Sequence, residues 1–174
     1  MNRLLLLALA ALVIASGGCS QSSELTVAPV ALADPGEPRQ AQPKLQTMKV
    51  YVGTQEVIAE LALTAPQQRA GMMFRTNLAE TAGMLFPLAY TQRASFWMNH
   101  CPLPLSAAYI DPEGIIQEIH EFEANNTNSV FAASDNIRFV LEMPQGWFKR
   151  HQIREGVAVA TERGPLMQTF FGKR

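Results

Sequence analysis

The sequence contains only two cysteines, Cys19 and Cys101, among its 174 residues. So few cysteines exclude the disulfide framework on which many small secreted domains depend. Charged residues are also scarce, at 17%, and 14 basic side chains nearly balance 15 acidic ones. Because a net charge of −1 provides no basic field to attract phosphates, we expect no nucleic-acid partner.

The sequence also has no apolar run long enough to cross a bilayer. The apolar run at the N-terminus covers residues 4–15, whereas a membrane-spanning helix needs about 20 residues. Arg3 precedes this run and small residues follow it, which is the pattern of a signal peptide over residues 1–18. We therefore expect the protein to be exported.

Small residues lead directly into Cys19, because Gly17 and Gly18 precede it. This arrangement resembles the bacterial lipobox, in which the cysteine is acylated and becomes the new N-terminus. Ser16 stands where a lipobox usually has an aliphatic residue, so ordinary cleavage at a small residue is the alternative. The residue after the cysteine is Ser20 and not Asp, which resembles the pattern of lipoproteins that are sorted to the outer membrane and not retained in the inner one. We expect a lipid on Cys19 to anchor the protein on the periplasmic side of the envelope.

The remainder of the chain divides by composition. Residues 19–46 carry four prolines among polar and small residues and show no lasting periodicity, which is typical of a flexible linker. Residues 47–163 form short β-rich runs and are predicted to be a single domain. Residues 164–174 are assigned to a C-terminal tail.

Within the domain, residues 49–52 and 57–63 predict a β-hairpin. Thr64 is placed to cap a short helix over residues 66–70, because its side chain can accept a hydrogen bond from the first turn. A proline in that first turn costs little, and Gly71 is suited to end the helix.

The sequence Asp-Pro-Glu-Gly at residues 111–114 predicts a tight turn, which would pair the strands that precede and follow it. Further strands are predicted at residues 84–86, 95–98, 105–110, 115–120, 138–143 and 157–160, with one helical turn at 147–152. The predicted fold is mainly β: a compact antiparallel sandwich or a partly closed, jelly-roll-like barrel with one or two short helices.

Several ordered blocks, together covering about residues 57–159, resemble a known family. The blocks are residues 64–75, 82–86, 95–98, 104–105, 109–111 with Gly114, and 140–142 followed by Gly146 and Trp147. They look like the family called domain of unknown function 192. This resemblance implies a small, mainly β domain that is commonly exported, and it brings neither an established reaction nor catalytic residues.

The chain departs from the family pattern within its most similar stretch. Asn99, His100 and Cys101 stand where the family usually has Lys-Asn-Thr, and Ser106 replaces the usual Asp. A basic and an acidic side chain are therefore both missing. If the family uses that pair for chemistry, the resemblance implies that this member is impaired or altered.

A set of arginine, aromatic and amide side chains suggests a groove for a small anionic or sugar-like ligand. The candidate ligand-binding residues are Arg69, Arg75, Arg93, Trp97, Asn99, His100 and Tyr109. The alternative is that the neighbouring aromatic residues are core, with Arg75 paired to Glu80 or Glu142 at its edge.

Met98, His100 and Cys101 offer ligands for a soft metal such as Cu(I) or Zn(II). In a strand, Met98 and His100 would share one face and Cys101 the other, so the three converge only if the chain turns. Cys101 could also form a nucleophile and base pair with His100, His120 or His151. The plainer interpretation of Cys101 is a buried structural thiol.

We expect an envelope-anchored binding or accessory module whose partner is a small ligand or an envelope protein. No complete catalytic constellation or cofactor motif is found, so no cofactor is expected. Two alternatives stay open. One is an envelope hydrolase or transferase that uses Cys101, His100 or His120, and the other is a soft-metal protein.

Overall fold

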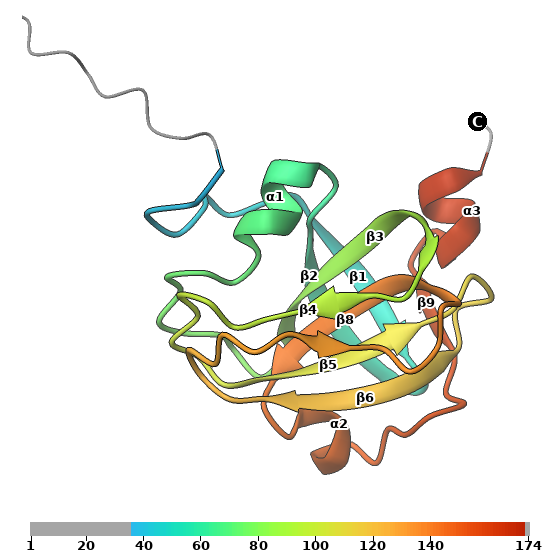
Figure 1. The fold of residues 1–174 in the computed structure, drawn as a ribbon. Helices are drawn as coiled ribbons and strands as arrows, with labels where there is room; N and C mark the ends of the chain where they lie inside the picture. The colour runs from blue at the N-terminus through green and yellow to red at the C-terminus, as the bar shows by residue number, and fades with distance from the viewer. Residues whose placement is uncertain (1–35, 173–174) are drawn as a thin grey trace, which may run out of the picture. The chain divides into compact units, whose positions relative to one another are not determined.

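Eight strands form one strongly curled sheet in the computed structural model, which describes residues 36–172 (Figure 1). In chain order they are β1 (Thr47–Val52), β2 (Gln55–Leu61), β3 (Ala82–Gln92), β5 (Leu105–Ile110), β6 (Ile116–Phe122), β8 (Ile137–Pro144), β9 (Val159–Thr161) and β10 (Gly164–Pro165). Their spatial order is β10-β9-β1-β2-β3-β8-β5-β6. The prediction of a mainly β, partly closed barrel is confirmed.

The remaining elements are short. Strands β4 (Ser95–Phe96) and β7 (Val130–Phe131) pair with each other outside the main sheet. The helices are α1 (Ala65–Ala70), α2 (Trp147–Arg150) and α3 (Leu166–Phe171). The predicted helical turn after Gly146 is thereby confirmed as α2, whereas α3 was not predicted.

The predicted hairpin and tight turn are both confirmed. Strands β1 and β2 are antiparallel, with Val52 opposite Gln55. At the second turn, the Gly114 N–H donates to the Asp111 carbonyl over 3.1 Å, and Asp111 Oδ1 accepts from the Ile115 N–H over 2.8 Å. The Asp111 side chain thus closes the turn that joins β5 to β6.

Helix α1 ends at the predicted residue and begins one residue earlier than predicted, at Ala65. Thr64 and Gln67 form a capping box, in which Thr64 Oγ1 accepts from the Gln67 N–H and Gln67 Oε1 accepts from the Thr64 N–H. Pro66 lies in the first turn, and Gly71 ends the helix with a φ of +44°. This short helix is therefore held by local hydrogen bonds at both ends.

One pairing differs from the antiparallel arrangement that we expected. Strands β2 and β3 are parallel, with Leu61 opposite Leu85. Parallel neighbours need a crossover connection, because a tight turn would reverse the chain. Here α1 and the residues after it form that connection, which places α1 beside the sheet (Figure 1).

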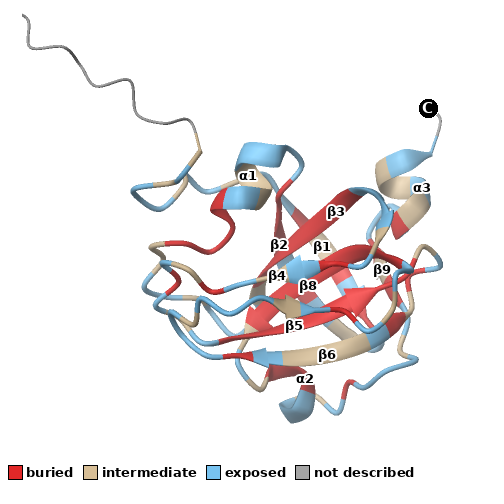
Figure 2. Ribbon diagram, in the orientation of Figure 1, coloured by how far each residue is buried: buried red, intermediate tan, exposed pale blue. Residues whose placement is uncertain are grey.

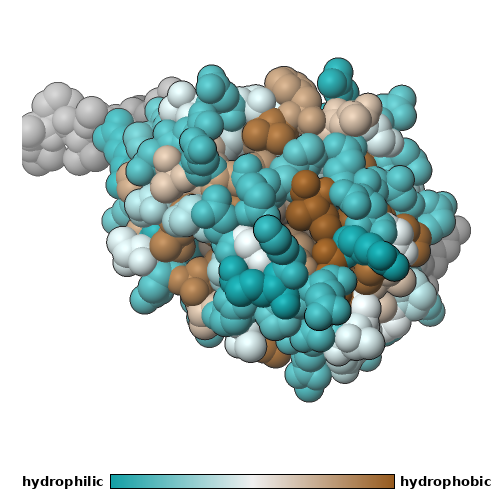
Figure 3. All heavy atoms as spheres, turned by 90° about the horizontal axis from the view of Figure 1, so that it is seen from below, coloured by the Kyte–Doolittle hydropathy of each residue, from teal (hydrophilic) through white to brown (hydrophobic). Residues whose placement is uncertain are grey.

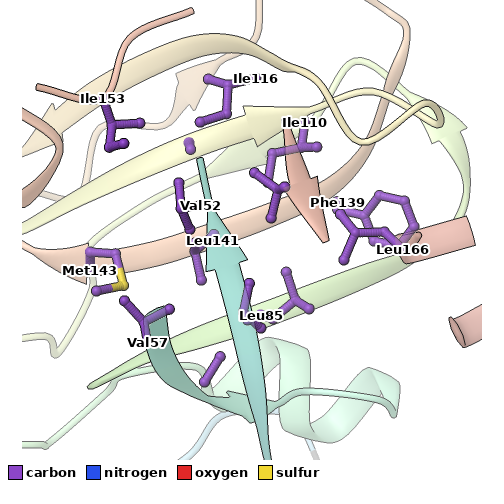
Figure 4. Close-up of a cluster of buried hydrophobic side chains, with 14 of the residues drawn as sticks. Val52, Val57, Leu85, Ile110, Ile116, Phe139, Leu141, Met143, Ile153 and Leu166 are labelled. Carbon is purple, nitrogen blue, oxygen red and sulfur yellow. The ribbon is translucent and has the colours of Figure 1, made fainter. Parts of the chain in front are cut away.

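The sheet separates two clusters of buried apolar side chains. Figure 2 shows that buried residues are concentrated in strands such as β3, β5 and β8. Because side chains alternate along a strand, β8 contributes Leu141 and Met143 to the first cluster and Val140 to the second. The first cluster is shown in Figure 4; it includes Leu141, Met143, Phe139, Leu85, Val52, Val57, Ile110, Ile116, Ile153 and Leu166. Glu142 alternates with Leu141 and Met143, so it faces the second cluster.

The folded part includes residues from the predicted linker and tail. Gln42 Nε2 donates to the carbonyls of Gln67 and Gly71, over 3.1 and 2.9 Å, and so attaches the segment before β1 to α1. After residue 163 the chain forms β10 and α3, and Leu166 is only 1% exposed. Part of the predicted linker and part of the predicted tail therefore pack against the domain.

The predicted signal peptide and the lipidation site Cys19 lie outside the described residues. Among residues 36–172, no helix has the length and apolar character needed to span a membrane. The face of the domain in Figure 3 is mostly hydrophilic, with small, separate hydrophobic patches.

Candidate functional site

A pocket with a volume of about 260 Å³ lies on the side of the second cluster. Its lining comes from α1 and the turn after it (Gln68, Arg69, Met72, Met73), from β3 (Phe86, Leu88), from residues 95–105 (Phe96, Trp97, Met98, Asn99, Cys101, Leu105) and from β8 (Glu142). Trp97 is 48% exposed and Glu142 only 4%. The pocket therefore runs from an aromatic and basic mouth to a buried carboxyl group.

Glu142 stands out among the residues of this pocket because its ionisable side chain is buried without a partner for one oxygen among residues 36–172. Its Oε2 atom is fully buried and has no hydrogen-bond partner among the described residues. Burial in the apolar surroundings raises the pKa of the carboxyl group to about 8. At neutral pH the empty pocket therefore presents mostly a neutral carboxylic acid, which can both donate and accept a hydrogen bond.

Glu142 belongs to the family-like block at residues 140–142, but it was not among the predicted site residues, and the only contact suggested for it was with Arg75. The sequence did contain a sign of its special position. Glu142 is the one acidic residue in β8, and the other residues from Phe139 to Met143 are apolar. A charged residue in a strand that is buried on both faces is rare unless it is paired or functional.

Sulfur-containing side chains gather in the same pocket. Met72, Met73 and Met98 line it together with Cys101. Burial, and to a lesser extent the negative charge of Glu142, raises the pKa of the Cys101 thiol to about 11. Cys101 is therefore a neutral thiol at physiological pH, and its Sγ atom lies 3.5 Å from the Leu103 carbonyl.

The predicted set of Met98, His100 and Cys101 is only partly brought together. The Cys101 N–H donates to the Met98 carbonyl over 3.0 Å, so the chain turns here and both residues line the pocket. His100, with a φ of +53°, stacks on Phe74 and does not line the pocket. Among residues 36–172, no group of three or more His, Cys, Asp or Glu side chains could hold a metal ion.

The three candidate arginines lie at separate places. Arg69 lines the pocket, and its Nη1 atom donates to the Gly36 carbonyl. Arg75 makes a two-pronged ion pair with Glu60, with N–O distances of 2.7 and 2.8 Å. Arg93 donates from Nε to the Ala132 carbonyl over 2.6 Å. Arg75 and Arg93 are thus engaged in structural contacts away from the pocket.

Arg75 does not pair with Glu80 or Glu142, the partners that the sequence suggested. Glu80 instead pairs with Arg150, at 3.0 and 2.8 Å, on the surface. This leaves Glu142 without an ion pair among the described residues.

The other candidate residues divide between the pocket and the core. Trp97 and Asn99 line the pocket. Tyr109 is fully buried and donates from Oη to the Val130 carbonyl over 2.8 Å. Burial raises the pKa of Tyr109 far above its usual value, so this phenol stays neutral. Its ring lies beside that of His120, with the centroids 4.9 Å apart.

His120 is paired with Glu118, not with Cys101. His120 Nε2 lies 2.9 Å from Glu118 Oε2, and Glu118 also accepts from the N–H groups of Ala133 and Ser134. Burial alone would raise the pKa of Glu118, but these hydrogen bonds and His120 hold it below its usual value. Glu118 therefore holds the chain after β7 against β6.

Together, the fold and the pocket define a small, mainly β domain with a curled sheet and a pocket that contains the buried carboxyl group of Glu142. A family model matches residues 48–161, and its family is DUF192, described as uncharacterized ACR. The chain belongs to the DUF192 family, as the motifs indicated.

Solved structures share this fold. A Sinorhizobium meliloti 1021 protein, provisionally described as a transcription regulator, is 25% identical with a TM-score of 0.66; the match covers 69% of this chain and 97% of that one. A Novosphingobium aromaticivorans DSM 12444 protein of unknown function is 28% identical with a TM-score of 0.63; the match covers 72% and 94%. No curated protein matches the chain significantly.

Proposed function

We propose that this domain binds a small ligand in the pocket lined by α1, Trp97 and Glu142. The observation that carries the proposal is the buried Glu142 carboxyl, whose Oε2 has no partner among residues 36–172. Leaving such a group unsatisfied costs about 1–3 kcal/mol. A ligand that supplies the missing partner recovers this cost, which makes Glu142 the anchoring group.

The shape of the pocket supports the same function. Its volume of about 260 Å³ lies just below the lower end of the range for small-molecule sites, so it suits a small ligand. Its lining is mostly apolar, with a few polar groups, which is the usual composition of a ligand site. An exposed aromatic ring at the mouth, Trp97, offers a surface on which a ligand can stack.

A ligand screen by thermal shift tests this proposal on the full-length protein extracted in detergent. Glu142→Gln keeps the side-chain size and removes the acid, whereas Glu80→Gln changes an exposed carboxylate outside the pocket. We expect ligands that stabilise the wild type and Glu80→Gln but stabilise Glu142→Gln much less. A screen in which no ligand depends on Glu142 would contradict the proposal.

We further propose that the domain works on the periplasmic side of the envelope, held by a lipid on Cys19, with the membrane as its partner. The signal-peptide pattern and the small residues before Cys19 support this location. The intact mass of membrane-extracted protein should show acyl chains, and Cys19→Ser should release the protein from the membrane. A mass equal to that of an ordinary cleaved chain would contradict the lipid anchor.

Soft-metal binding is a second candidate because Met72, Met73, Met98 and Cys101 line one pocket. Thioether and thiol sulfur suit Cu(I). Metal analysis of gently purified protein, compared with Cys101→Ser, tests it. Stoichiometric copper or zinc that is lost in the variant would favour this candidate over an organic ligand.

The charge of this chain does not favour transcription regulation, the role provisionally described for the Sinorhizobium protein. With a net charge of −1, the chain gains little of the electrostatic attraction on which nucleic-acid binding depends.

A further inference from the structure

Two charged side chains line the pocket, and they differ in exposure. Arg69 on α1 is exposed and donates to the Gly36 carbonyl, whereas Glu142 is buried. The titratable groups that interact electrostatically with Glu142 are Cys101, just before β5, and Tyr109 on β5. Burial keeps both of them neutral. Within residues 36–172, no cation forms an ion pair with Glu142.

Two side-chain amides that line the pocket already donate to oxygen atoms of the protein. Gln68 Nε2 donates to the carbonyls of Ala62 and Pro87, over 3.0 and 2.8 Å. Asn99 Nδ2 donates to Glu37 Oε1 over 3.1 Å. Neither amide bonds to Glu142, so a ligand that carries a hydrogen-bond donor can supply the partner that Glu142 Oε2 lacks among residues 36–172.

The walls above the carboxyl group are apolar and polarisable. Phe86, Phe96 and Trp97 contribute aromatic rings, and Met72 and Met98 contribute thioethers. Aromatic faces attract cations through their quadrupole, and they also pack against hydrocarbon. The walls thus suit a ligand with a cationic end and an apolar body.

We propose that the ligand is a small primary amine with an apolar body, whose ammonium group binds the Glu142 carboxylate. This inference rests on the proposed function and names its ligand class. An ammonium group carries three donors and no acceptor, which matches the oxygen acceptors of the Glu142 carboxylate, of which Oε2 has no partner among residues 36–172. Charge-assisted hydrogen bonds are also roughly twice as strong as neutral ones.

Binding changes the protonation of Glu142 in a defined way. In the empty pocket, burial keeps the carboxyl group protonated at neutral pH. When the ammonium ion enters, the O–H bond of Glu142 breaks, the proton goes to the solvent, and a carboxylate–ammonium pair forms. One proton is therefore released for each amine bound, and no other reactant is needed.

Anions and neutral alcohols fit less well. An anion could bind Arg69 at the mouth and accept a hydrogen bond from the protonated Glu142, but the two would repel each other once Glu142 loses its proton at high pH. An alcohol would form a neutral hydrogen bond with the protonated Glu142, which is the weaker kind of contact.

Calorimetric titration of the full-length protein in detergent tests the ligand class. Isoamylamine, isoamyl alcohol and isovalerate are suitable probes because they share a branched apolar body and differ in the polar group. We expect the amine to bind at least about tenfold tighter than the other two. Glu142→Gln should weaken amine binding at least about tenfold, whereas the control Glu80→Gln should leave it unchanged.

The pH dependence of the wild type provides a test that does not rely on any variant folding. Because binding releases one proton, amine affinity should rise about tenfold from pH 6 to pH 7. Titrations in two buffers of different ionisation enthalpy should give heats that differ accordingly. An affinity that stays constant over this range would overturn the amine assignment.

These experiments distinguish a failure of the amine assignment from a failure of the proposed ligand-binding function. If the alcohol or the acid binds tighter than the amine, and Glu142→Gln weakens that binding, the amine assignment is wrong and the pocket still binds a ligand. If Glu142→Gln weakens no ligand in the titrations or the thermal-shift screen, the proposed function fails as well.

Discussion

Asn99 donates from Nδ2 to Glu37 Oε1 over 3.1 Å, although the two lie 62 positions apart in the chain. Asn99 lines the pocket, and Glu37 belongs to the segment that precedes β1. A second hydrogen bond joins the same two parts of the protein: Arg69 Nη1, which also belongs to the pocket lining, donates to the Gly36 carbonyl over 3.1 Å. The mouth of the pocket is therefore attached to the segment that leads toward the proposed membrane anchor.

Removing this contact should loosen the segment without unfolding the domain. In Asn99→Ala, we expect faster amide hydrogen exchange in residues 36–42 and a change in the free energy of unfolding below about 1 kcal/mol, because the contact is exposed. Hydrogen exchange followed by mass spectrometry measures the first effect, and urea denaturation the second. Unchanged exchange in this segment would contradict the prediction.

Glu142 should make the protein less stable as the pH rises. Its pKa is about 8 in the folded state and 4.5 for an ordinary glutamate. Between these values the folded state holds a proton that the unfolded state has released, so the free energy of unfolding falls with increasing pH. The total loss is on the order of 5 kcal/mol, because the two pKa values differ by about 3.5 units. Urea denaturation at pH values from 5 to 9 measures it.

Two variants serve as controls for this slope. Glu142→Gln has no proton to lose, so the difference in unfolding free energy between wild type and variant should change across the window. Glu80→Gln alters an exposed carboxylate, so it should keep the wild-type slope. Parallel profiles for wild type and Glu142→Gln would show that the buried carboxyl group does not titrate as described.

Local signals in the sequence predicted the elements well where short-range chemistry decides the structure. The capping box at Thr64 and the Asp111 turn depend on side chains within four residues of each other. The parallel pairing of β2 and β3 could not be predicted in this way. It depends on contacts between strands separated by α1, and no local residue pattern encodes such a pairing.

The candidate site was predicted only in part for the same reason. Trp97, Asn99, Met98 and Cys101 lie in one stretch, and all of them line the pocket. Glu142 joins them from β8, 41 positions beyond Cys101 in the sequence. Sequence spacing could not reveal that neighbour, although an acidic residue within a buried strand was itself a signal.

Cys101 should react slowly with thiol reagents in the native protein. Its side chain is buried, at 3% exposure, and burial raises its pKa to about 11, so little thiolate exists at pH 7. We expect labelling that is slower than for the urea-unfolded protein by about 100-fold or more, because the pKa of about 11 in the folded protein lies about two units above the ordinary value of 9.0 and burial also blocks access. Rapid labelling of the native protein would instead support the nucleophile hypothesis.

Arg75 should contribute more to stability than Arg150, although both make two hydrogen bonds to a glutamate. The side chains of Arg75 and Glu60 are 16% and 11% exposed, whereas those of Arg150 and Glu80 are each 49% exposed. Removing one partner of a largely buried pair leaves a charge with poor solvation. We expect Arg75→Ala to lower the free energy of unfolding by about 2 kcal/mol and Arg150→Ala by less than about 1 kcal/mol.

The stability that is lost in Arg75→Ala should depend on pH. Whereas the contribution of Glu142 to stability falls as the pH rises, that of the Arg75–Glu60 pair falls as the pH decreases. Burial alone would raise the pKa of Glu60, but Arg75 and the Leu45 N–H hold it below its usual 4.5. The stabilisation by the pair is therefore present above pH 4.5 and is lost as the pH falls through the folded-state pKa. Urea denaturation at pH 7 and pH 3 measures both states. The cost of Arg75→Ala should shrink at the lower pH, and an equal cost at both values would show that the Arg75 contribution comes from packing and not from charge.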